Sequence, residues 1–364
     1  MSETRRIIVL GGTGCTGRLI VQDLLRHRPD DKVDAGARRP ERSAGLPAGV
    51  GRVRVDWRDR ETAGRLLAGY DLVILAVGPF EVVGDAAHRL CVDAGVDCLD
   101  INDSLPAARA IFALDARAKE KGVRVLTGMG LSPGLTTLLM LDVLRRSARG
   151  RRTLRSRLFV GGKQDAGRSA IRAMLASFAA EVPVVRRGAY AAVPSDDGSP
   201  DSIFAFAPGD APVKVLHYPT PEAWTLPAHL PDELRDVEEM DYRVHFQGIP
   251  MFFVKALRAL PALRAHLSTS LISLPVHAIH DVMKRRKDEG VVVAAECAGP
   301  GGVVTAAAHA PSSYEATARF ASAVAHLALE GGLAAGPGVH SFEMAGGDSS
   351  ELRELLRRRG IHLS

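Results

Sequence analysis

Glycines near the N-terminus are spaced for binding a phosphate group. Residues 7–10 are apolar and run directly into Gly12-Thr13-Gly14-Cys15-Thr16-Gly17, a G-x-G-x-x-G pattern. Residues 18–27 follow with apolar side chains at helical spacing. In such a strand–turn–helix unit Gly12 permits the tight turn, Gly14 lets the backbone approach a pyrophosphate, and Gly17 allows close helix–strand packing. The free N–H groups of the helix N-terminus then hold the anion. We therefore predict that these six residues bind a dinucleotide, and that they are not an ordinary glycine-rich turn.

The end of the second predicted strand distinguishes two dinucleotides. NAD-binding proteins place an acid there for the ribose 2′-hydroxyl, whereas NADP-binding proteins use arginine for the 2′-phosphate. Asp34 lies in the middle of the strand predicted at 32–37, while Arg38 stands at its end with Arg39 and Ser43 nearby. A guanidinium binds phosphate in bidentate fashion and stacks on adenine. We predict NADPH/NADP rather than NAD; the alternative is a pair of surface arginines in a turn.

Later strand ends complete the predicted cofactor site. Asp56 either contacts the adenine amino group or caps a turn. At Gly78-Pro79-Phe80 the backbone lacks side-chain bulk and could pass close to the nicotinamide ribose, and the side chain of Phe80 could pack against the nicotinamide ring. Alternatively, Gly-Pro is simply a common turn. Gly130-Leu131 is predicted to form a floor near the nicotinamide, and Ser132 beside it is a candidate substrate contact.

Two acids follow the fifth predicted strand and could supply a proton. Hydride chemistry belongs to the cofactor, so the protein must supply mainly position, charge and a proton. A carboxylic acid serves only if burial raises its pKa toward neutrality. Asp100 follows the apolar end of a buried strand, so we rank it ahead of Asp103, which is expected to cap the helix at Pro106. A purely structural role for both acids, or a proton from water or a substrate amine, is the alternative.

Alternating strands and helices must position these residues. Strands are predicted at 7–10, 32–37, 52–56, 71–77, 97–101 and 123–126, with helices at 18–27, 60–68, 82–94 and 106–122 between them. This alternation predicts an α/β fold with a doubly wound parallel sheet, the Rossmann arrangement, which binds ligands at the carboxyl ends of its strands. Further on, strands are predicted at 182–192 and 213–217, a hairpin at 290–308 and a long helix from 314.

Composition excludes several classes of function. The chain has 364 residues, enough for two domains, with 46% hydrophobic and 24% charged residues, as in soluble globular proteins. The net charge is only +5, because the 47 basic residues are interspersed with 42 acidic ones, and aromatic residues are few. A nucleic-acid partner is therefore not expected. The 4 cysteines lack metal-ligand spacing. No signal peptide or transmembrane segment is apparent, which predicts a cytoplasmic protein.

Several motifs occur in an order that resembles a known family. They are Gly-Gly-Thr-Gly at 11–14, Ala-Arg-Arg-Pro-Glu at 37–41, Val-Gly-Pro-Phe at 77–80, Cys-x-x-x-Gly-Val-x-Cys-Leu-Asp at 91–100 and Gly-Leu-Ser-Pro-Gly-Leu-Thr at 130–136. Together they resemble the saccharopine dehydrogenase-like oxidoreductases. The resemblance implies a Rossmann domain at 1–145, a mixed α+β domain on an open sheet at 146–311, and helices at 312–364 returning to the first domain. It also implies NADPH-dependent reduction of a C=N bond or, in a bacterial branch, trans-acting enoyl reduction of polyketide lipids.

The chain departs from the family where a substrate would bind. Family members that use amino acids carry Gly-Leu-Asp-Pro-Gly, whereas this chain has Ser132 in place of the acid, which weakens the case for a cationic amino-acid substrate. Residues 249–283 are strongly apolar and form either core, a dimer face or a wall for a hydrophobic substrate. Tyr242 and His245 are further candidate substrate contacts.

The functional hypotheses are therefore an NADPH-dependent reductase of a C=N or C=C bond, a trans-acting enoyl reductase, and a non-catalytic NADPH-binding sensor or scaffold. A small or carrier-bound substrate and a homodimer are expected, and no metal.

Overall fold

The computed structural model describes residues 4–42, 45–163, 181–207, 209–248 and 290–364. The chain forms two compact units. The first contains residues 1–138 and 314–361, and the second contains residues 139–313 and 362–364. The second unit is thus inserted into the first, and the chain passes from the first unit to the second within one helix, α7 (Leu135–Arg146).

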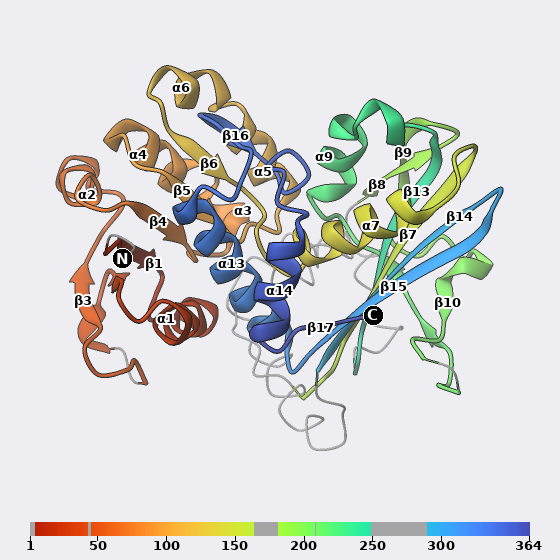
Figure 1. The fold of residues 1–364 in the computed structure, drawn as a ribbon, viewed down its shortest axis with the longest axis horizontal. Coiled ribbons are helices and arrows are strands. Elements are labelled where there is room, and N and C mark those ends of the chain that lie inside the picture. The colour runs from red at the N-terminus through yellow and green to blue at the C-terminus, as the bar shows by residue number, and fades with distance from the viewer. Residues whose placement is uncertain (1–3, 43–44, 164–180, 208, 249–289) are drawn as a thin grey trace, which may run out of the picture. The chain divides into compact units, whose positions relative to one another are not determined.

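The first unit is built on a parallel sheet (Figure 1). Its strand order is β3–β2–β1–β4–β5–β6–β16. The strands are β1 (Arg6–Leu10), β2 (Lys32–Ala37), β3 (Gly51–Arg54), β4 (Leu72–Leu75), β5 (Cys98–Asp100), β6 (Arg124–Leu126) and β16 (Gly338–His340). The order reverses between β1 and β4, which opens a crevice at the carboxyl ends of these strands. The predicted doubly wound α/β fold is confirmed.

Helices connect these strands, and two predicted helices are divided. The helices are α1 (Cys15–His27), α2 (Arg60–Leu67), α3 (Phe80–Val83), α4 (Ala86–Ala94), α5 (Leu105–Phe112), α6 (Asp115–Glu120), α13 (Ser313–Glu330) and α14 (Ser350–Arg358). Gly84, with φ of 57°, separates α3 from α4 because that backbone conformation cannot continue a right-handed helix. The predicted helix 106–122 becomes α5 and α6 because the last turn of α5 tightens, Ala113 N–H reaching both Arg109 O and Ile111 O.

Apolar strands form the core of the first unit, and a buried polar cluster attaches the C-terminal helices. Ile8, Val73 and Leu75 are completely buried or nearly so within the layer covered by α2 and α4.

On α1, Asp23 accepts a hydrogen bond from Arg359 Nε at 2.9 Å and another from the hydroxyl of Ser322 on α13. Because these groups are buried, the polar contacts fix α13 and the end of α14 against α1.

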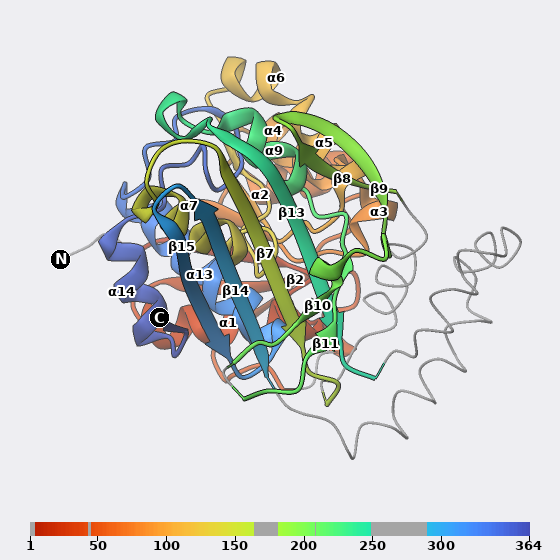
Figure 2. The ribbon, with the colours of Figure 1, turned by 90° about the vertical axis from the view of Figure 1, so that its right-hand side faces the viewer.

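The second unit is built on a mixed sheet with strand order β17–β15–β14–β7–β13–β8–β9. Its elements are β7 (Arg152–Val160), β8 (Glu181–Arg186), β9 (Ala189–Pro194), β10 (Ile203–Phe204), β11 (Val213–Lys214), β12 (Leu216–His217), α9 (Glu222–His229), β13 (Val237–Phe246), β14 (Val291–Gly299), β15 (Gly302–Ala310) and β17 (His362–Leu363). Only β7 and β13 pair in parallel along this path. Figures 1 and 2 show β10 and β11 over one face of this sheet and α9 on the other.

Some predictions for the second unit hold and one is wrong. The hairpin predicted at 290–308 is confirmed as β14 and β15. The single strand predicted at 182–192 is instead the hairpin β8–β9, because Arg187 and Gly188 both adopt positive φ and reverse the chain. The apolar segment 249–283 lies outside the described residues. In the part of the chain that the structure describes, every helix is too short or too polar to cross a bilayer.

Candidate active site

The glycine turn forms a cradle at the N-terminus of α1. Gly14 is the N-cap residue and brings no side chain to the first N–H groups of the helix, which stay available for an anion. A side chain on Gly17 would place its Cβ only 2.2 Å from the carbonyl oxygen of Gly11. Thr13 and Thr16 are half-buried in this turn and Cys15 is exposed. The residues present therefore fit a dinucleotide pyrophosphate.

Hydrogen bonds place this cradle between the neighbouring strands. Gly11 N–H donates to Gly36 O of β2 at 2.8 Å, and Ala76 N–H donates to Leu10 O of β1 at 2.8 Å. The turns that follow β2 and β4 therefore flank the cradle, as the sequence predicts.

Beyond β2 the structure separates the two residues that distinguish NAD from NADP. Arg38 and Arg39 are both exposed at the strand end. The carboxylate of Asp34 instead accepts a hydrogen bond from Tyr70 Oη at 2.7 Å, so it is engaged within the protein rather than available for a ribose 2′-hydroxyl. Desolvation and this contact raise the pKa of Tyr70 to about 12. Ser43 lies outside the described residues.

Asp56 stabilises its own turn. Its carboxylate accepts from Arg58 Nε at 2.8 Å, from Arg58 Nη2 at 2.6 Å and from the Arg58 backbone N–H at 3.2 Å. The hydrogen bond from Arg58 is the main reason that the pKa of Asp56 is lowered to about 2, and the charge of Arg38 acts in the same direction. Of the two predicted roles, the structure shows turn capping. The adenine contact stays a prediction.

The turn after β4 has an exposed backbone and a buried ring. Gly78 is exposed and Pro79 is half-buried, but Phe80 is only 4% exposed and its ring centroid lies 6.5 Å from that of His88. Phe80 therefore packs into the first unit. Val82 in the same short helix, α3, is 81% exposed.

The loop after β6 is closed on itself. Gly130 N–H donates to Pro133 O at 3.0 Å, and Leu135 N–H donates back to Gly130 O at 2.9 Å. Leu131 is buried and Ser132 is half-buried. The loop thus presents mainly backbone, which suits the predicted floor.

Asp100 is not placed as a proton donor. It is completely buried, Oδ2 lies 2.7 Å from His88 Nε2, and Oδ1 accepts from Asn102 N–H at 2.7 Å and Gly128 N–H at 2.8 Å. Both carboxylate oxygens are therefore occupied by protein groups and cannot reach a substrate. Burial does occur as predicted, but it comes with hydrogen-bond donors that hold the carboxylate in a structural role.

Asp103 differs from Asp100 in its exposure and in its contacts. It is exposed and does not cap α5, because Ser104 is the N-cap and its Oγ accepts from Ala107 N–H at 3.4 Å. Although water reaches its side chain, the pKa of Asp103 is raised to about 7, first by desolvation in the surrounding protein and then by the negative charges of Glu81 and Asp100. The raised pKa makes Asp103 a candidate proton donor near neutral pH.

Residues 7–126 match the family model of the saccharopine dehydrogenase NADP-binding domain. This part of the chain is therefore a saccharopine dehydrogenase NADP-binding domain. This match confirms the resemblance seen in the sequence and the prediction of NADP as the dinucleotide. The NADP-binding domain includes the glycine cradle, Arg38 and the turn after β4, and it ends before the loop that contains Gly130.

Relatives of this family align over part of the chain. A probable mitochondrial saccharopine dehydrogenase-like oxidoreductase of Arabidopsis thaliana is 26% identical over 141 residues, covering 34% of this chain and 31% of that protein. The trans-acting enoyl reductase of Mycobacterium tuberculosis is 25% identical over 149 residues, covering 39% of this chain and 36% of that protein. The alignments thus span about a third of these relatives' lengths. Apo saccharopine dehydrogenase (L-Glu forming) from Saccharomyces cerevisiae shares the fold, with a TM-score of 0.68 over 99% of both chains at 14% identity.

In the second unit, the two predicted substrate contacts lie on opposite faces of β13. Tyr242 is 4% exposed and its Oη donates to Glu222 O of α9 at 3.3 Å. His245 lies three residues further along the strand, stacks on Phe159 and places Nδ1 2.8 Å from Lys214 O. Because alternate residues of a strand point to opposite faces, Tyr242 and His245 cannot line one site together. A role for either residue in binding substrate stays a prediction.

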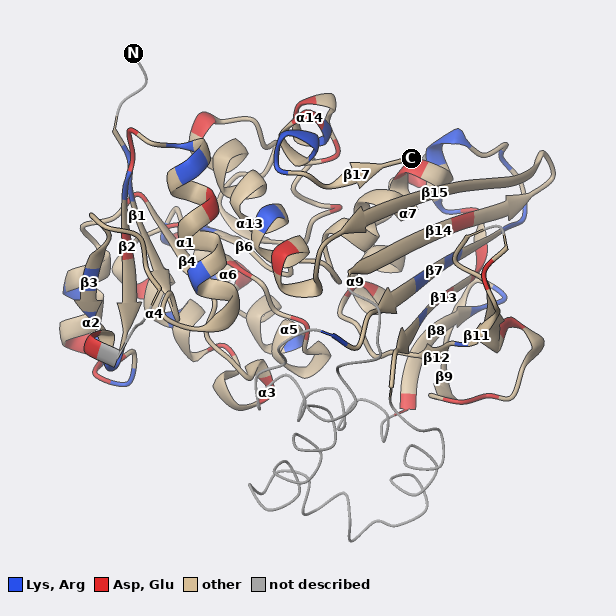
Figure 3. Ribbon diagram, turned by 90° about the horizontal axis from the view of Figure 1, so that it is seen from below, with Lys and Arg blue, Asp and Glu red and all other residues tan. Residues whose placement is uncertain are grey.

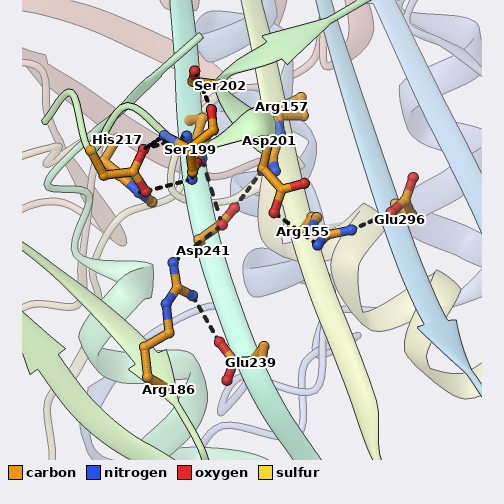
Figure 4. A network of polar contacts seen from close by, with 12 residues as sticks. Arg155, Arg157, Arg186, Ser199, Asp201, Ser202, His217, Glu239, Asp241 and Glu296 are labelled. Carbon is orange, nitrogen blue, oxygen red and sulfur yellow. Dashed lines mark hydrogen bonds and ion pairs between the residues drawn. The ribbon is translucent and has the colours of Figure 1, made fainter. Parts of the chain in front are cut away.

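A network of charged residues occupies the face of the second sheet that β10 and β11 cover (Figure 4). Arg157 and Asp241 form a buried ion pair, and Arg243 contacts Asp197 in bidentate fashion at 3.0 and 3.2 Å. Arg155 of β7 pairs with Glu296 of the neighbouring β14 at 3.0 Å, as Figure 4 shows. In Figure 3 the two strands have a basic band on β7 and an acidic band on β14.

A cavity of about 390 Å³ opens onto this network. Its lining residues are Thr153, Arg155, Arg186, Asp197, Ser199, Asp201, Glu239, Met240, Asp241 and Arg243. Each charged residue of this lining is paired with an opposite charge within the network. The charges thus satisfy one another, and the network serves to fix the 195–202 loop on the sheet.

Proposed function

We propose that this protein is an NADPH-dependent reductase of a C=N or C=C bond in a small or carrier-bound metabolite, with Asp103 as its proton donor. The observation that carries the proposal is the position of Asp103, exposed at the carboxyl end of β5 and next to the strand whose turn is predicted to hold the nicotinamide. The raised pKa of this carboxyl, about 7, supports it. A reduced C=N or C=C product needs a proton, and an acid of this pKa supplies it most effectively near neutral pH.

The residues divide the work of this reaction. The cofactor, when bound, supplies the hydride. The cradle of residues 12–17 holds the pyrophosphate, and Arg38 with Arg39 holds the 2′-phosphate. Gly78, Pro79 and the Gly130-Leu131 loop present backbone toward the nicotinamide, and Ser132 contacts the substrate. Asp103 holds a proton on its carboxyl oxygen, delivers it as the bond is reduced, and leaves as a carboxylate that solvent reprotonates.

Turnover of NADPH with two substrate panels tests this proposal. One panel pairs amino acids with aldehydes to form imines, and the other contains enoyl thioesters of increasing chain length. Asp103→Asn keeps the shape of the side chain and should remove most of the turnover while leaving NADPH binding intact. Asp71→Asn, whose carboxylate accepts the Arg6 N–H at 2.7 Å at the opposite, amino end of β4, is the matched control. Equal turnover in Asp103→Asn and the unmodified protein would exclude Asp103 as the donor.

Reduction of a carrier-bound enoyl group is the second candidate. It is favoured by the similarity to the mycobacterial trans-acting enoyl reductases, by Ser132 in place of the acid that amino-acid-using family members carry, and by the exposed Val82 beside the predicted nicotinamide turn. Turnover of enoyl thioesters without turnover of imines selects it. Tight NADPH binding without oxidation on either panel instead supports the sensor or scaffold hypothesis.

Assembly and location stay predictions. A homodimer would appear as twice the chain's mass of 38.8 kDa in light scattering. Cell fractionation tests the cytoplasmic location.

A further inference from the structure

A buried pair of side chains lies directly behind the proposed donor. His88 of α4 and Asp100 of β5 are both completely inaccessible, and His88 Nε2 lies 2.7 Å from Asp100 Oδ2. Among the described residues, His88 Nδ1 has no hydrogen-bond partner, so the polar function of the ring is directed to Asp100 alone.

The other oxygen of Asp100 binds two separate loops. Asp100 Oδ1 accepts from Asn102 N–H at 2.7 Å and from Gly128 N–H at 2.8 Å, and the backbone oxygen of Asp100 accepts from Met129 N–H at 2.8 Å. Asn102 precedes Asp103, whereas Gly128 and Met129 lead into the predicted nicotinamide floor. A single carboxylate therefore fixes the turn after β5 relative to the loop after β6.

The chain of contacts continues around Asp103. Asn102 Oδ1 accepts from Ser104 N–H at 2.9 Å, and Asn102 Nδ2 donates to Ser104 O at 3.1 Å. Both neighbours of Asp103 are thus buried and held by hydrogen bonds, while Asp103 itself stays exposed. The arrangement leaves the Asp103 backbone little freedom to move.

We infer that His88 and Asp100 are positioning residues, which hold the Asp103 carboxyl in register with the floor of the nicotinamide site. This inference rests on the proposed function. His88 orients Asp100, and Asp100 in turn locks the two loops between which a substrate and the nicotinamide would meet. The pair also has an electrostatic effect, because the negative charge of Asp100 contributes to the raised pKa of Asp103, together with Glu81 of α3.

Three variants separate positioning from folding. Asp100→Asn keeps an oxygen for the N–H groups of Asn102 and Gly128 but removes the charge. His88→Gln keeps a donor toward Asp100, whereas His88→Leu removes it. Asp71→Asn is the matched control, because Asp71 is a carboxylate of the same unit that accepts Arg6 N–H at 2.7 Å at the opposite, amino end of β4.

The first measurement is the pH dependence of kcat/KM for reduction. For Asp100→Asn we expect the upper pKa of the profile to fall below that of the unmodified protein, because removing a nearby negative charge eases ionisation of Asp103. For His88→Leu we expect kcat to fall about 10- to 100-fold with little change in NADPH affinity, since small displacements of a catalytic group have costs of this order. His88→Gln should recover most of that loss, and Asp71→Asn should change neither quantity.

The second measurement does not need turnover. The pKa of Asp103 is read directly from the ¹³C shift of its carboxyl group by NMR, in the unmodified protein and in the folded variants. If no substrate is turned over, the proposed function fails, but a lowered Asp103 pKa in Asp100→Asn with none in Asp71→Asn still supports the inferred coupling. The inference is overturned if the Asp103 pKa is the same in Asp100→Asn as in the unmodified protein, or if His88→Leu turns over substrate at the unmodified rate.

Discussion

Replacement of Arg38 by alanine should weaken NADPH much more than NADH. Arg38 is exposed at the end of β2 and forms no ion pair with any described residue, so its guanidinium can bind a 2′-phosphate without giving up another contact. A hydrogen bond to a charged group is worth about 1.5–3 kcal/mol. Because the residue is exposed and screened by solvent, the lower part of this range applies, which corresponds to about 10- to 50-fold in Kd. NADH lacks the phosphate, so its Kd should change less than about twofold by the same argument.

Fluorescence titration of both reduced dinucleotides at low and high salt measures this effect. The NADPH affinity of the unmodified protein should fall with salt more steeply than that of Arg38→Ala, since the variant has lost a charge–charge contact. Arg65→Ala is the control, because it removes another exposed arginine of the same unit, one that pairs with Glu61. The reasoning is refuted if the unmodified protein binds NADH as tightly as NADPH, or if Arg65→Ala weakens NADPH as much as Arg38→Ala.

Four further outcomes follow from the described contacts. Because Asp103 donates only when protonated, kcat/KM for reduction should be constant below about pH 7 and fall above it in a stopped-flow pH series. Gly17→Ala should cost about 1–3 kcal/mol of stability, and lose NADPH binding in the same titration, since its Cβ would lie 2.2 Å from Gly11 O. Asp241→Asn leaves the buried guanidinium of Arg157 without its ion-pair partner and should lower the free energy of unfolding, measured in urea, by about 3–5 kcal/mol. Glu61→Gln, which breaks the exposed pair with Arg65, should lower it by less than about 1 kcal/mol. Burial disfavours the charge of Asp197, but hydrogen bonds from His217, Ser199 and Arg243 outweigh this effect and hold the pKa of Asp197 well below its usual value. The stability that the carboxylate contributes is complete above pH about 3.9 and is lost as the pH falls further. The difference in unfolding free energy between the unmodified protein and Asp197→Asn should therefore disappear in acid.

The dinucleotide domain could be predicted because its signals are local. The apolar run before Gly12, the glycine spacing and the helical pattern after Gly17 all lie within 21 residues of sequence, and each corresponds to one element of the structure. The position of Arg38 follows in the same way from the length of β2. Local signals of this kind need no knowledge of tertiary contacts.

The contacts of the two candidate proton donors could not be predicted, because they are not local in the sequence. Whether a buried carboxyl is neutral or charged depends on the donors around it, and those of Asp100 come from His88 on α4 and Gly128 beyond β6. Nothing in the sequence pairs these residues. The polar network of the second unit is equally invisible, since Asp197 and Arg243 are 46 residues apart and meet only after β13 has formed.

The insertion of the second unit delays completion of the first sheet during synthesis. β6 pairs on its outer side only with β16, where Val125 lies opposite Val339. About 210 residues separate these strands, so at roughly 5–20 residues per second the nascent domain waits about 10–40 s with an apolar edge unpaired. Such an edge is a template for pairing with another chain. The unpaired edge of β6 is thus exposed while the second unit is synthesised, and a chaperone that shields β6 during this interval should raise the yield of folded protein.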